Sequence, residues 1–225
     1  MKHLLIFNLH GLGEPPGSIP PDELQYWLPR DFFVELLERV AHLPQVRLSF
    51  DDGNESDFEV ALPELVKRGL RAEFFVLAGR VGQPGYLGAA QLREMVSAGM
   101  GIGLHGMDHR SWARCDSREL DVEIDEARRQ IESIVGRPVL RAACPFGAYN
   151  APSLRKLRRC GFERVYTSDG GVTRQRDWLQ ARNTLRSSHR LSDVQALVER
   201  PPVGLRHLRR RLRTFAKSNR RRVSR

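Results

Sequence analysis

The chain has 225 residues, of which 40% are hydrophobic, and its formal net charge at pH 7 is +10. This length suits one α/β domain with a full core and is too short for two such domains. The composition is that of a globular chain rather than a disordered one, and no apolar run approaches the ~20 residues that span a bilayer. One folded domain is therefore expected.

The excess of positive charge lies at the carboxyl end. Residues 206–225 contain ten Lys and Arg and no acid, which leaves 27 basic and 27 acidic residues in the rest of the chain. We therefore expect a folded domain over residues 1–200 and a basic tail over residues 201–225.

Apolar residues recur within this tail. Leu205, Leu208, Leu212 and Phe215 fall at near-helical spacing, which favours a helix that lies on an anionic membrane surface or docks on the domain over a free solubilising arm. Nucleic acid would attract the same charge, but the basic residues are confined to one end and carry no recognisable nucleic-acid-binding motif. An anionic membrane surface is therefore the expected partner of the tail, and nucleic acid is disfavoured.

The amino terminus and the cysteines indicate the compartment. Residues 1–10 carry only a short apolar run with no small-residue cleavage site after it, so they predict a first strand rather than a leader. Cys115, Cys144 and Cys160 are odd in number and irregularly spaced, which favours neither a disulfide framework nor a thiolate zinc site. We expect a cytoplasmic protein that attaches peripherally to the inner membrane face.

Strand-like runs alternate with helical patterns along the chain. The predicted strands cover residues 3–9, 46–50, 73–78, 100–104, 138–143, 163–168 and 179–185. Helices are predicted near residues 31–42, 56–68, 89–98, 150–160 and 191–199, and another begins at the capping box Asp116–Glu119 and stops at Gly136. This alternation predicts an α/β fold with a parallel barrel.

Chemically reactive side chains follow several of these strands. Asp51 and Asp52 close the run Val46–Phe50, and Gly53 breaks it, whereas His105 and His109 follow residues 100–104. Alone, Asp-Asp-Gly is usually a turn, and two histidines four apart are usually surface residues. Because both motifs lie at strand carboxyl ends, as does Cys144-Pro145-Phe146-Gly147, together they predict a hydrolytic metal site on one face of the sheet.

The order of three motifs carries a resemblance. Ser49-Phe50-Asp51-Asp52-Gly53, then His105-Gly106-Met107-Asp108-His109, then the run Cys144–Asn150 resemble the polysaccharide deacetylase family, the NodB-homology carbohydrate esterases, over roughly residues 3 to 195. Residues 51–63 and 165–170 resemble its bacterial exopolysaccharide-associated branch. The resemblance implies an incomplete, seven-stranded (β/α) barrel, in agreement with the seven predicted strands.

The resemblance also implies a reaction. It assigns Asp52, His105 and His109 as ligands of a divalent metal, Asp51 as the general base, and the backbone N–H of Phe146 to the oxyanion. Mixed oxygen and nitrogen ligands favour zinc, with cobalt or nickel as alternatives. The expected function is a metal-dependent hydrolase that removes N-acetyl groups from an acetylated amino sugar in a polysaccharide or glycolipid.

The chain departs from the family pattern in two places. Ala142-Ala143-Cys144 stands where many members carry an arginine that orients the base, and no Leu-x-His motif is evident near the carboxyl end. Arg182 or Asp169 could steady the base instead, and Arg141 lies nearby. His10 is favoured as the acid that protonates the leaving amine, with His189 as the alternative.

Other functions fit the same scaffold. An O-acetyl esterase or a cyclic amidase would use the same metal, and a degenerate carbohydrate-binding protein would explain the missing arginine, although the intact ligand set argues against it. Aromatic residues are expected to form a rim that stacks on sugar faces; they are Tyr26, Trp27, Tyr86, Trp112 and Trp178.

Overall fold

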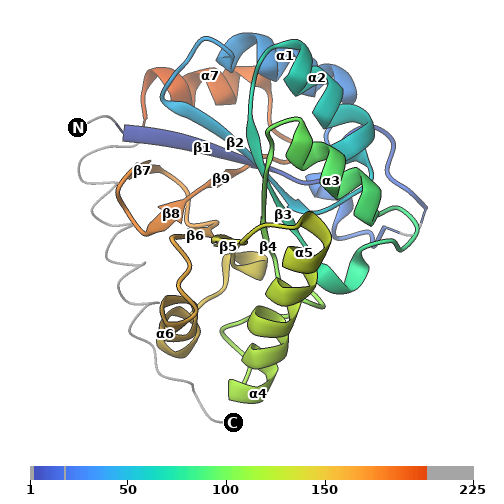
Figure 1. The fold of residues 1–225 in the computed structure, drawn as a ribbon. Coiled ribbons are helices and arrows are strands. Elements are labelled where there is room, and N and C mark those ends of the chain that lie inside the picture. Colours follow the sequence, from blue (N-terminus) through green and yellow to red (C-terminus); the bar gives the residue numbers. More distant parts are fainter. Residues whose placement is uncertain (1–2, 18, 202–225) are drawn as a thin grey trace.

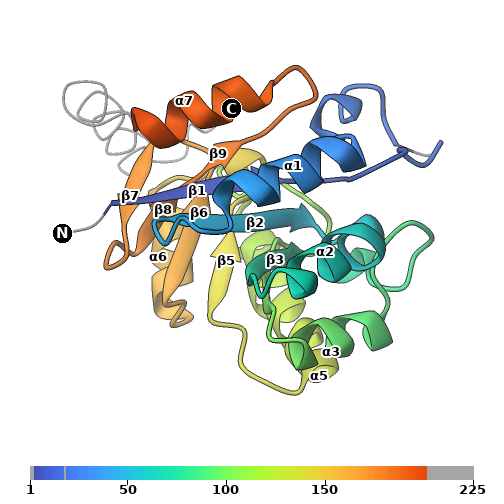
Figure 2. The ribbon, with the colours of Figure 1, turned by 90° about the horizontal axis from the view of Figure 1, so that it is seen from above.

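The computed structural model describes residues 3–17 and 19–201, which form one sheet surrounded by helices (Figure 1). The strand order is β7-β1-β2-β3-β4-β5-β6-β8, and β9 pairs with β1. The strands are β1 (His3–Leu9), β2 (Val46–Asp52), β3 (Ala72–Val76), β4 (Gly101–Leu104), β5 (Arg141–Ala143), β6 (Arg164–Thr167), β7 (Val172–Arg174), β8 (Leu179–Ala181) and β9 (Asn183–Thr184). Strands β1 to β6 follow one another in parallel, as Figure 2 shows for β1 and β2.

The sheet curls into a nearly closed barrel, which confirms the predicted fold class. The segment predicted as one strand over residues 179–185 closes it, because its first half pairs with β6 and its second half pairs with β1. Arg182 lies between the two halves. The sequence did not predict β7, a three-residue strand that pairs antiparallel with the start of β1.

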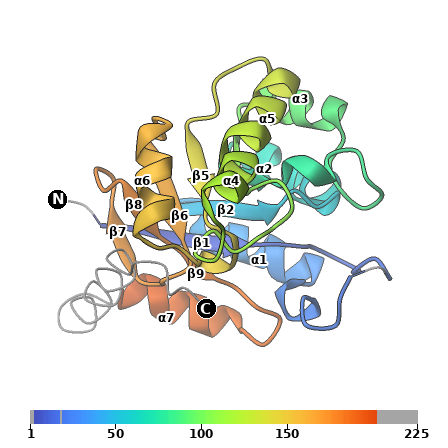
Figure 3. The ribbon, with the colours of Figure 1, turned by 90° about the horizontal axis from the view of Figure 1, so that it is seen from below.

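Helices cover the outside of the barrel (Figures 1 and 3). They are α1 (Arg30–Val40), α2 (Leu62–Lys67), α3 (Ala89–Ser97), α4 (Ser117–Leu120), α5 (Ala127–Val135), α6 (Ala151–Arg159) and α7 (Leu191–Glu199). A π-helical stretch, Asp121–Glu126, joins α4 to α5, and another, Asp57–Ala61, precedes α2. The predicted capping box starts α4, since the Asp116 carboxylate accepts the Glu119 N–H at 2.9 Å, and Gly136 stops α5 with φ 69°.

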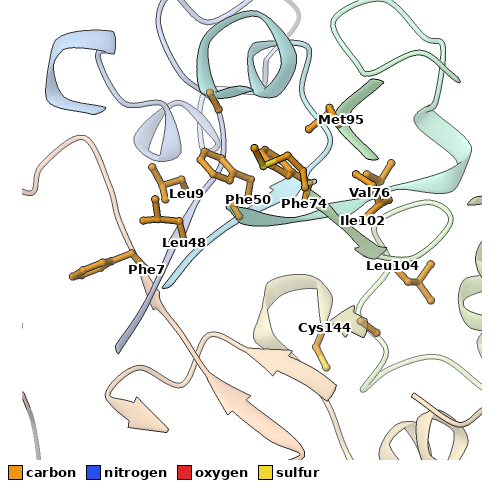
Figure 4. Packing of buried hydrophobic residues seen from close by; sticks show 14 of the residues in the cluster. Phe7, Leu9, Leu48, Phe50, Phe74, Val76, Met95, Ile102, Leu104 and Cys144 are labelled. Carbon is orange, nitrogen blue, oxygen red and sulfur yellow. The ribbon is translucent and has the colours of Figure 1, made fainter. Parts of the chain in front are cut away.

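The main core lies between the sheet and the helices. Phe50 of β2 and Phe74 of β3 stack with ring centroids 4.7 Å apart, and Met95 of α3 belongs to the same cluster (Figure 4). Inside the barrel the apolar cluster is much smaller and consists of Ile6, Phe75, Ala143 and Tyr166, with Leu4 packed against it. Gly103 of β4 leaves space for the Phe75 ring there, because a Cβ on this glycine would overlap it.

The basic tail falls outside the described residues, so its membrane attachment stays a prediction. Among the residues described, no helix combines the length and the hydropathy needed to cross a bilayer.

Candidate metal centre and active site

The paired carboxylates stand at the carboxyl end of β2, as the sequence predicts. Asp51 and Asp52 are its last two residues, and the backbone turns sharply there, with φ 79° at Asp52 and 73° at Gly53. A positive φ is uncommon outside glycine. The turn separates the two side chains, so that Asp51 meets Arg182 and Asp52 meets the two histidines.

Asp52, His105 and His109 form a compact donor cluster. Asp52 Oδ1 lies 3.5 Å from His105 Nε2 and 3.6 Å from His109 Nε2, distances too long for hydrogen bonds. Two ligands ~2.1 Å from one ion at tetrahedral angles lie ~3.4 Å apart. The Asp52 oxygen is buried and has no hydrogen-bond partner in the part of the chain that the structure describes. Donor chemistry and spacing therefore fit a divalent ion.

Both histidines are positioned by residues outside the donor cluster, His105 through its ring and His109 through its loop. His105 follows β4, and its Nδ1 lies 2.9 Å from the carbonyl oxygen of Ala143, which fixes the ring with Nε2 toward Asp52. The loop that carries His109 is held by the buried Glu123 carboxylate, which accepts the N–H of Asp108 at 3.0 Å and the indole N–H of Trp112 at 3.3 Å. The histidine positions thus depend on neighbouring elements.

Burial sets the protonation of this cluster. It raises the pKa of Asp52 to about 6, and it lowers the pKa of His105 to about 3. Burial, with the Arg80 charge nearby, also lowers the pKa of His109. Both imidazoles are therefore neutral near pH 7, which is the form that binds metals.

Asp51 belongs to a buried polar network inside the barrel. Arg182 donates to both of its oxygens, from Nη1 at 2.6 Å and from Nη2 at 2.8 Å, and the Asn8 amide donates to it at 2.9 Å. Burial alone would raise the pKa of Asp51, but the charge and hydrogen bonds of Arg182, together with the nearby histidines His105 and His10, outweigh burial and hold this pKa well below its usual range. Of the two residues expected to steady this acid, Arg182 does so, whereas Asp169 accepts hydrogen bonds from Tyr149 and Thr167.

These groups open into a cavity of about 690 Å³ at the carboxyl ends of the strands. His10 and His189 both line it. The His10 ring lies 4.8 Å from that of Tyr26, and its Nδ1 is buried with no hydrogen-bond partner among the described residues, whereas His189 Nδ1 accepts the N–H of Arg186.

Phe146 lies in the one-turn helix Pro145–Gly147, at the same cavity. It has φ 58°, its ring is 67% exposed, and this ring lies 4.2 Å from that of His109. Phe146 is therefore not a core residue. As the second residue of a short helix, its N–H has no acceptor within that helix.

The predicted aromatic rim is only partly present. Tyr26 and Trp27 line the cavity, but Trp112 is fully buried behind Glu123 and Trp178 packs under Arg158 on another face. Tyr86 accepts a hydrogen bond from Arg80 and does not line the cavity. A sequence does not distinguish an exposed tryptophan from a buried one when both lie in loops.

Two positioning residues were missed in the sequence. Asn8 lies inside an apolar strand, and Glu123 interrupts an apolar helical stripe. A polar residue at a position that the pattern predicts to be buried indicates a polar partner, because burying it without one is costly. This signal could have identified both residues. Arg141, in contrast, pairs with Glu73 near the amino ends of the strands, far along the barrel from Asp51.

Comparison with known proteins agrees with this geometry. A sequence model of the polysaccharide deacetylase family matches residues 40–165. The chain belongs to this family. It is 30% identical to a chitooligosaccharide deacetylase of Rhizobium leguminosarum bv. trifolii, over 59% of either chain, and 24% identical to YxkH of Bacillus subtilis, over 65% of this chain and 53% of that one. The chain thus spans little more than half the length of these curated relatives.

Solved structures share the fold. The Streptococcus pyogenes deacetylase PplD superposes with a TM-score of 0.75 at 19% identity, covering 86% of this chain and 96% of that one. IcaB from Ammonifex degensii superposes with a TM-score of 0.71 at 24% identity, covering 87% of this chain and 97% of that one.

Proposed function

We propose that this deacetylase-family protein is a metal-dependent hydrolase that removes the N-acetyl group from an acetylated amino sugar of a polysaccharide or glycolipid. The observation that carries the proposal is the convergence of Asp52, His105 and His109 beside the Arg182-paired Asp51, in one cavity that also contains His10. This set offers three metal ligands, a carboxylate and an imidazole within one site.

Asp52, His105 and His109 would hold a divalent ion, with zinc favoured and cobalt or nickel as alternatives. When bound, such an ion supplies a Lewis acid that polarises the acetyl carbonyl and makes water a stronger acid. Three protein ligands leave coordination positions open, as is usual for catalytic sites.

Asp51 is the proposed general base. Its Oδ2 lies 3.9 Å from His105 Nε2, so this carboxylate borders the metal cluster. The bidentate contact from Arg182 keeps it ionised and fixes its orientation, which leaves it ready to take a proton from the attacking water. That water adds to the carbonyl carbon and generates an oxyanion.

Phe146 and His10 complete the proposed reaction. The N–H of Phe146, a residue that lines the cavity, would donate to the oxyanion. His10 would donate a proton to the departing nitrogen as the C–N bond breaks, which yields acetate and a free amine. The charge of His10 lies within electrostatic reach of both Asp51 and Asp52.

The cavity supports a sugar as the substrate class. Tyr26 and Trp27 line it together with polar residues, an arrangement suited to stacking on a sugar face while hydroxyls are hydrogen-bonded. We also propose a cytoplasmic location, with peripheral contact at the inner membrane face through the basic tail.

Metal analysis combined with acetate release tests this proposal. The purified protein should contain one divalent ion and release acetate from short N-acetylated amino-sugar oligomers. His105→Ala and His109→Ala should lose the ion and the activity, whereas His42→Ala, at an exposed histidine beyond α1, should keep both. Full metal binding by the first two variants would disprove the ligand assignment, and release of acetate only from O-acetylated sugars would replace the amide with an ester as the bond cleaved.

A further inference from the structure

A second cavity opens at the opposite end of the barrel. Its volume is about 800 Å³, and none of its lining residues lines the active-site cavity. It is formed where strands β2 to β6 begin, and five arginines line it, namely Arg47, Arg71, Arg137, Arg141 and Arg164. We call these five residues and their cavity the arginine bowl.

The acids in the arginine bowl do not balance its positive charge. Among the residues that the structure describes, Glu73 and Glu163 are the only acids that line it, so the five arginines leave three positive charges in excess. Arg141 pairs with Glu73, and the charges of Arg137 and Arg164 act on the same carboxylate. Guanidinium groups therefore converge on one half-buried acid that can neutralise only one of them.

The arginines keep hydrogen-bonding capacity. Arg137 donates from one nitrogen to the carbonyl oxygen of Met100 at 2.8 Å, and Arg164 donates from one nitrogen to that of Gln175 at 3.4 Å. A guanidinium has five N–H donors, so most remain unused. Each contact holds one guanidinium nitrogen, and the remaining N–H groups of Arg137 and Arg164 can donate to a ligand.

Glu73 gives the bowl a polar interior. Its Oε2 is buried without a hydrogen-bond partner among the described residues, and it lies against Gly101, where a Cβ would overlap it. Deeper in the cavity, Ser49 separates the bowl from the active site, since its hydroxyl lies 3.3 Å from Arg182 Nη1. The bowl is thus a separate site behind the catalytic network.

We infer that the arginine bowl binds the phosphate or diphosphate group of a small molecule or lipid. A phosphate carries about two negative charges and accepts hydrogen bonds in several directions, which matches several guanidinium forks around an excess of three charges. The apolar lining residues Ile6 and Tyr166 would contact the less polar part of such a ligand. This inference does not depend on the proposed reaction.

Calorimetric titration of the full-length protein with inorganic pyrophosphate tests the site. The variant Arg137→Gln/Arg164→Gln should bind pyrophosphate at least about tenfold more weakly than the parent, because it loses two charged donors. The matched control Arg93→Gln/Arg129→Gln removes two exposed arginines of the helical layer and should bind like the parent. Arg71→Glu changes an exposed side chain of the bowl and should also weaken pyrophosphate binding. It keeps the experiment decisive if the double variant fails to fold.

Vesicles distinguish the source of the phosphate. The same proteins are sedimented with phosphatidic acid vesicles and with neutral vesicles. If the parent binds phosphatidic acid vesicles and the double variant does not, the ligand is a lipid phosphate. If the parent binds pyrophosphate but not these vesicles, the ligand is a soluble phosphate. Equal binding by parent, double variant and control would place the anion on the metal centre or the tail and would overturn the inference. No binding of either probe would overturn it as well.

Discussion

Asp52, His109 and Phe146 have positive φ values of 79°, 56° and 58°, and they are the non-glycine residues with this conformation in the described part of the chain. The left-handed conformation costs such residues roughly 1–2 kcal/mol each. All three line the cavity of the candidate active site. Strain of this kind persists where the surrounding structure enforces it.

The general-base assignment predicts a selective loss of rate in Asp51→Asn. This variant should keep the bound metal but lose about 10² to 10⁴ in turnover, since the amide cannot accept the proton. Acetate release and metal content measured on the same preparation check it. Turnover equal to that of the parent would place the base on another residue.

Arg182 is predicted to stabilise the fold through Asp51. Arg182→Gln should lower the free energy of unfolding by about 3–5 kcal/mol near pH 7, because it leaves a buried carboxylate without its partner. The folded-state pKa of Asp51 is depressed, so the contribution of the pair is present above the unfolded-state pKa and lost as pH falls. Urea unfolding should therefore show the difference between parent and variant narrowing below about pH 4. A difference independent of pH would contradict this account.

Metal affinity should depend on one proton at Asp52. The pKa of this residue is raised to about 6 and that of His105 is lowered to about 3, so a proton competes at the carboxylate first as pH falls. Affinity should be constant above about pH 7 and fall about tenfold per unit below pH 6. Competition with a chromophoric chelator measures this, and a fall of about a hundredfold per unit would show that a histidine titrates as well.

At the scale of elements, the helical stretch after α4 positions the histidine loop. Glu123 accepts N–H groups from Met107 and Asp108, and the indole N–H of Trp112. The Glu123 carboxylate also requires a glycine at position 106, because a Cβ there would overlap it. The loop carrying His109 is thus anchored to a helix on the outside of the barrel.

Removing this anchor should weaken the metal site without removing a ligand. Glu123→Ala should lower metal affinity about 10- to 100-fold, as is typical when a residue that orients ligands is lost. The neighbouring Glu126 is exposed, so Glu126→Ala is the matched control and should change nothing. Metal titration of both variants measures the effect, and equal affinities would show that the His109 loop keeps its shape unaided.

At the scale of the whole molecule, the barrel separates two kinds of surface. The carboxyl ends of the strands carry the carboxylates and histidines, and the amino ends carry the arginine bowl. Segments far apart in the sequence form each, since Arg182 meets Asn8 across 174 positions. Closure of the barrel between β6 and β1 brings them together.

The tail is predicted to act apart from this barrel. A chain that ends at Gly204 should stay folded, keep its rate on soluble substrate and lose salt-sensitive binding to anionic vesicles, because ten cations are removed. Vesicle sedimentation at two salt concentrations and thermal unfolding check it. Equal vesicle binding by both forms would contradict membrane attachment, and unfolding of the shortened chain would show that the segment docks on the barrel.

The sequence alone determined the metal-ligand candidates, the family and the order of strands and helices, apart from β7 and the division of residues 179–185 into β8 and β9. These features depend on local patterns: Val46–Phe50 reads as a buried strand wherever it lies, and Asp116 caps a helix three residues away. Parallel strands place their carboxyl ends at one edge, so the positions of Asp52 and His105 after two such strands are enough to predict that they lie together.

Only the tertiary structure decided which residue supports Asp51. Arg182 and Asp169 both follow strands. Arg182 reaches Asp51 because it lies at the break between β8, which pairs with β6, and β9, which pairs with β1. Likewise, Arg141 and Arg164 are the first residues of two strands, and only the folded barrel places both at the same cavity. Closure of the sheet decides which side chains meet across the barrel, and a local sequence pattern carries no information about that closure.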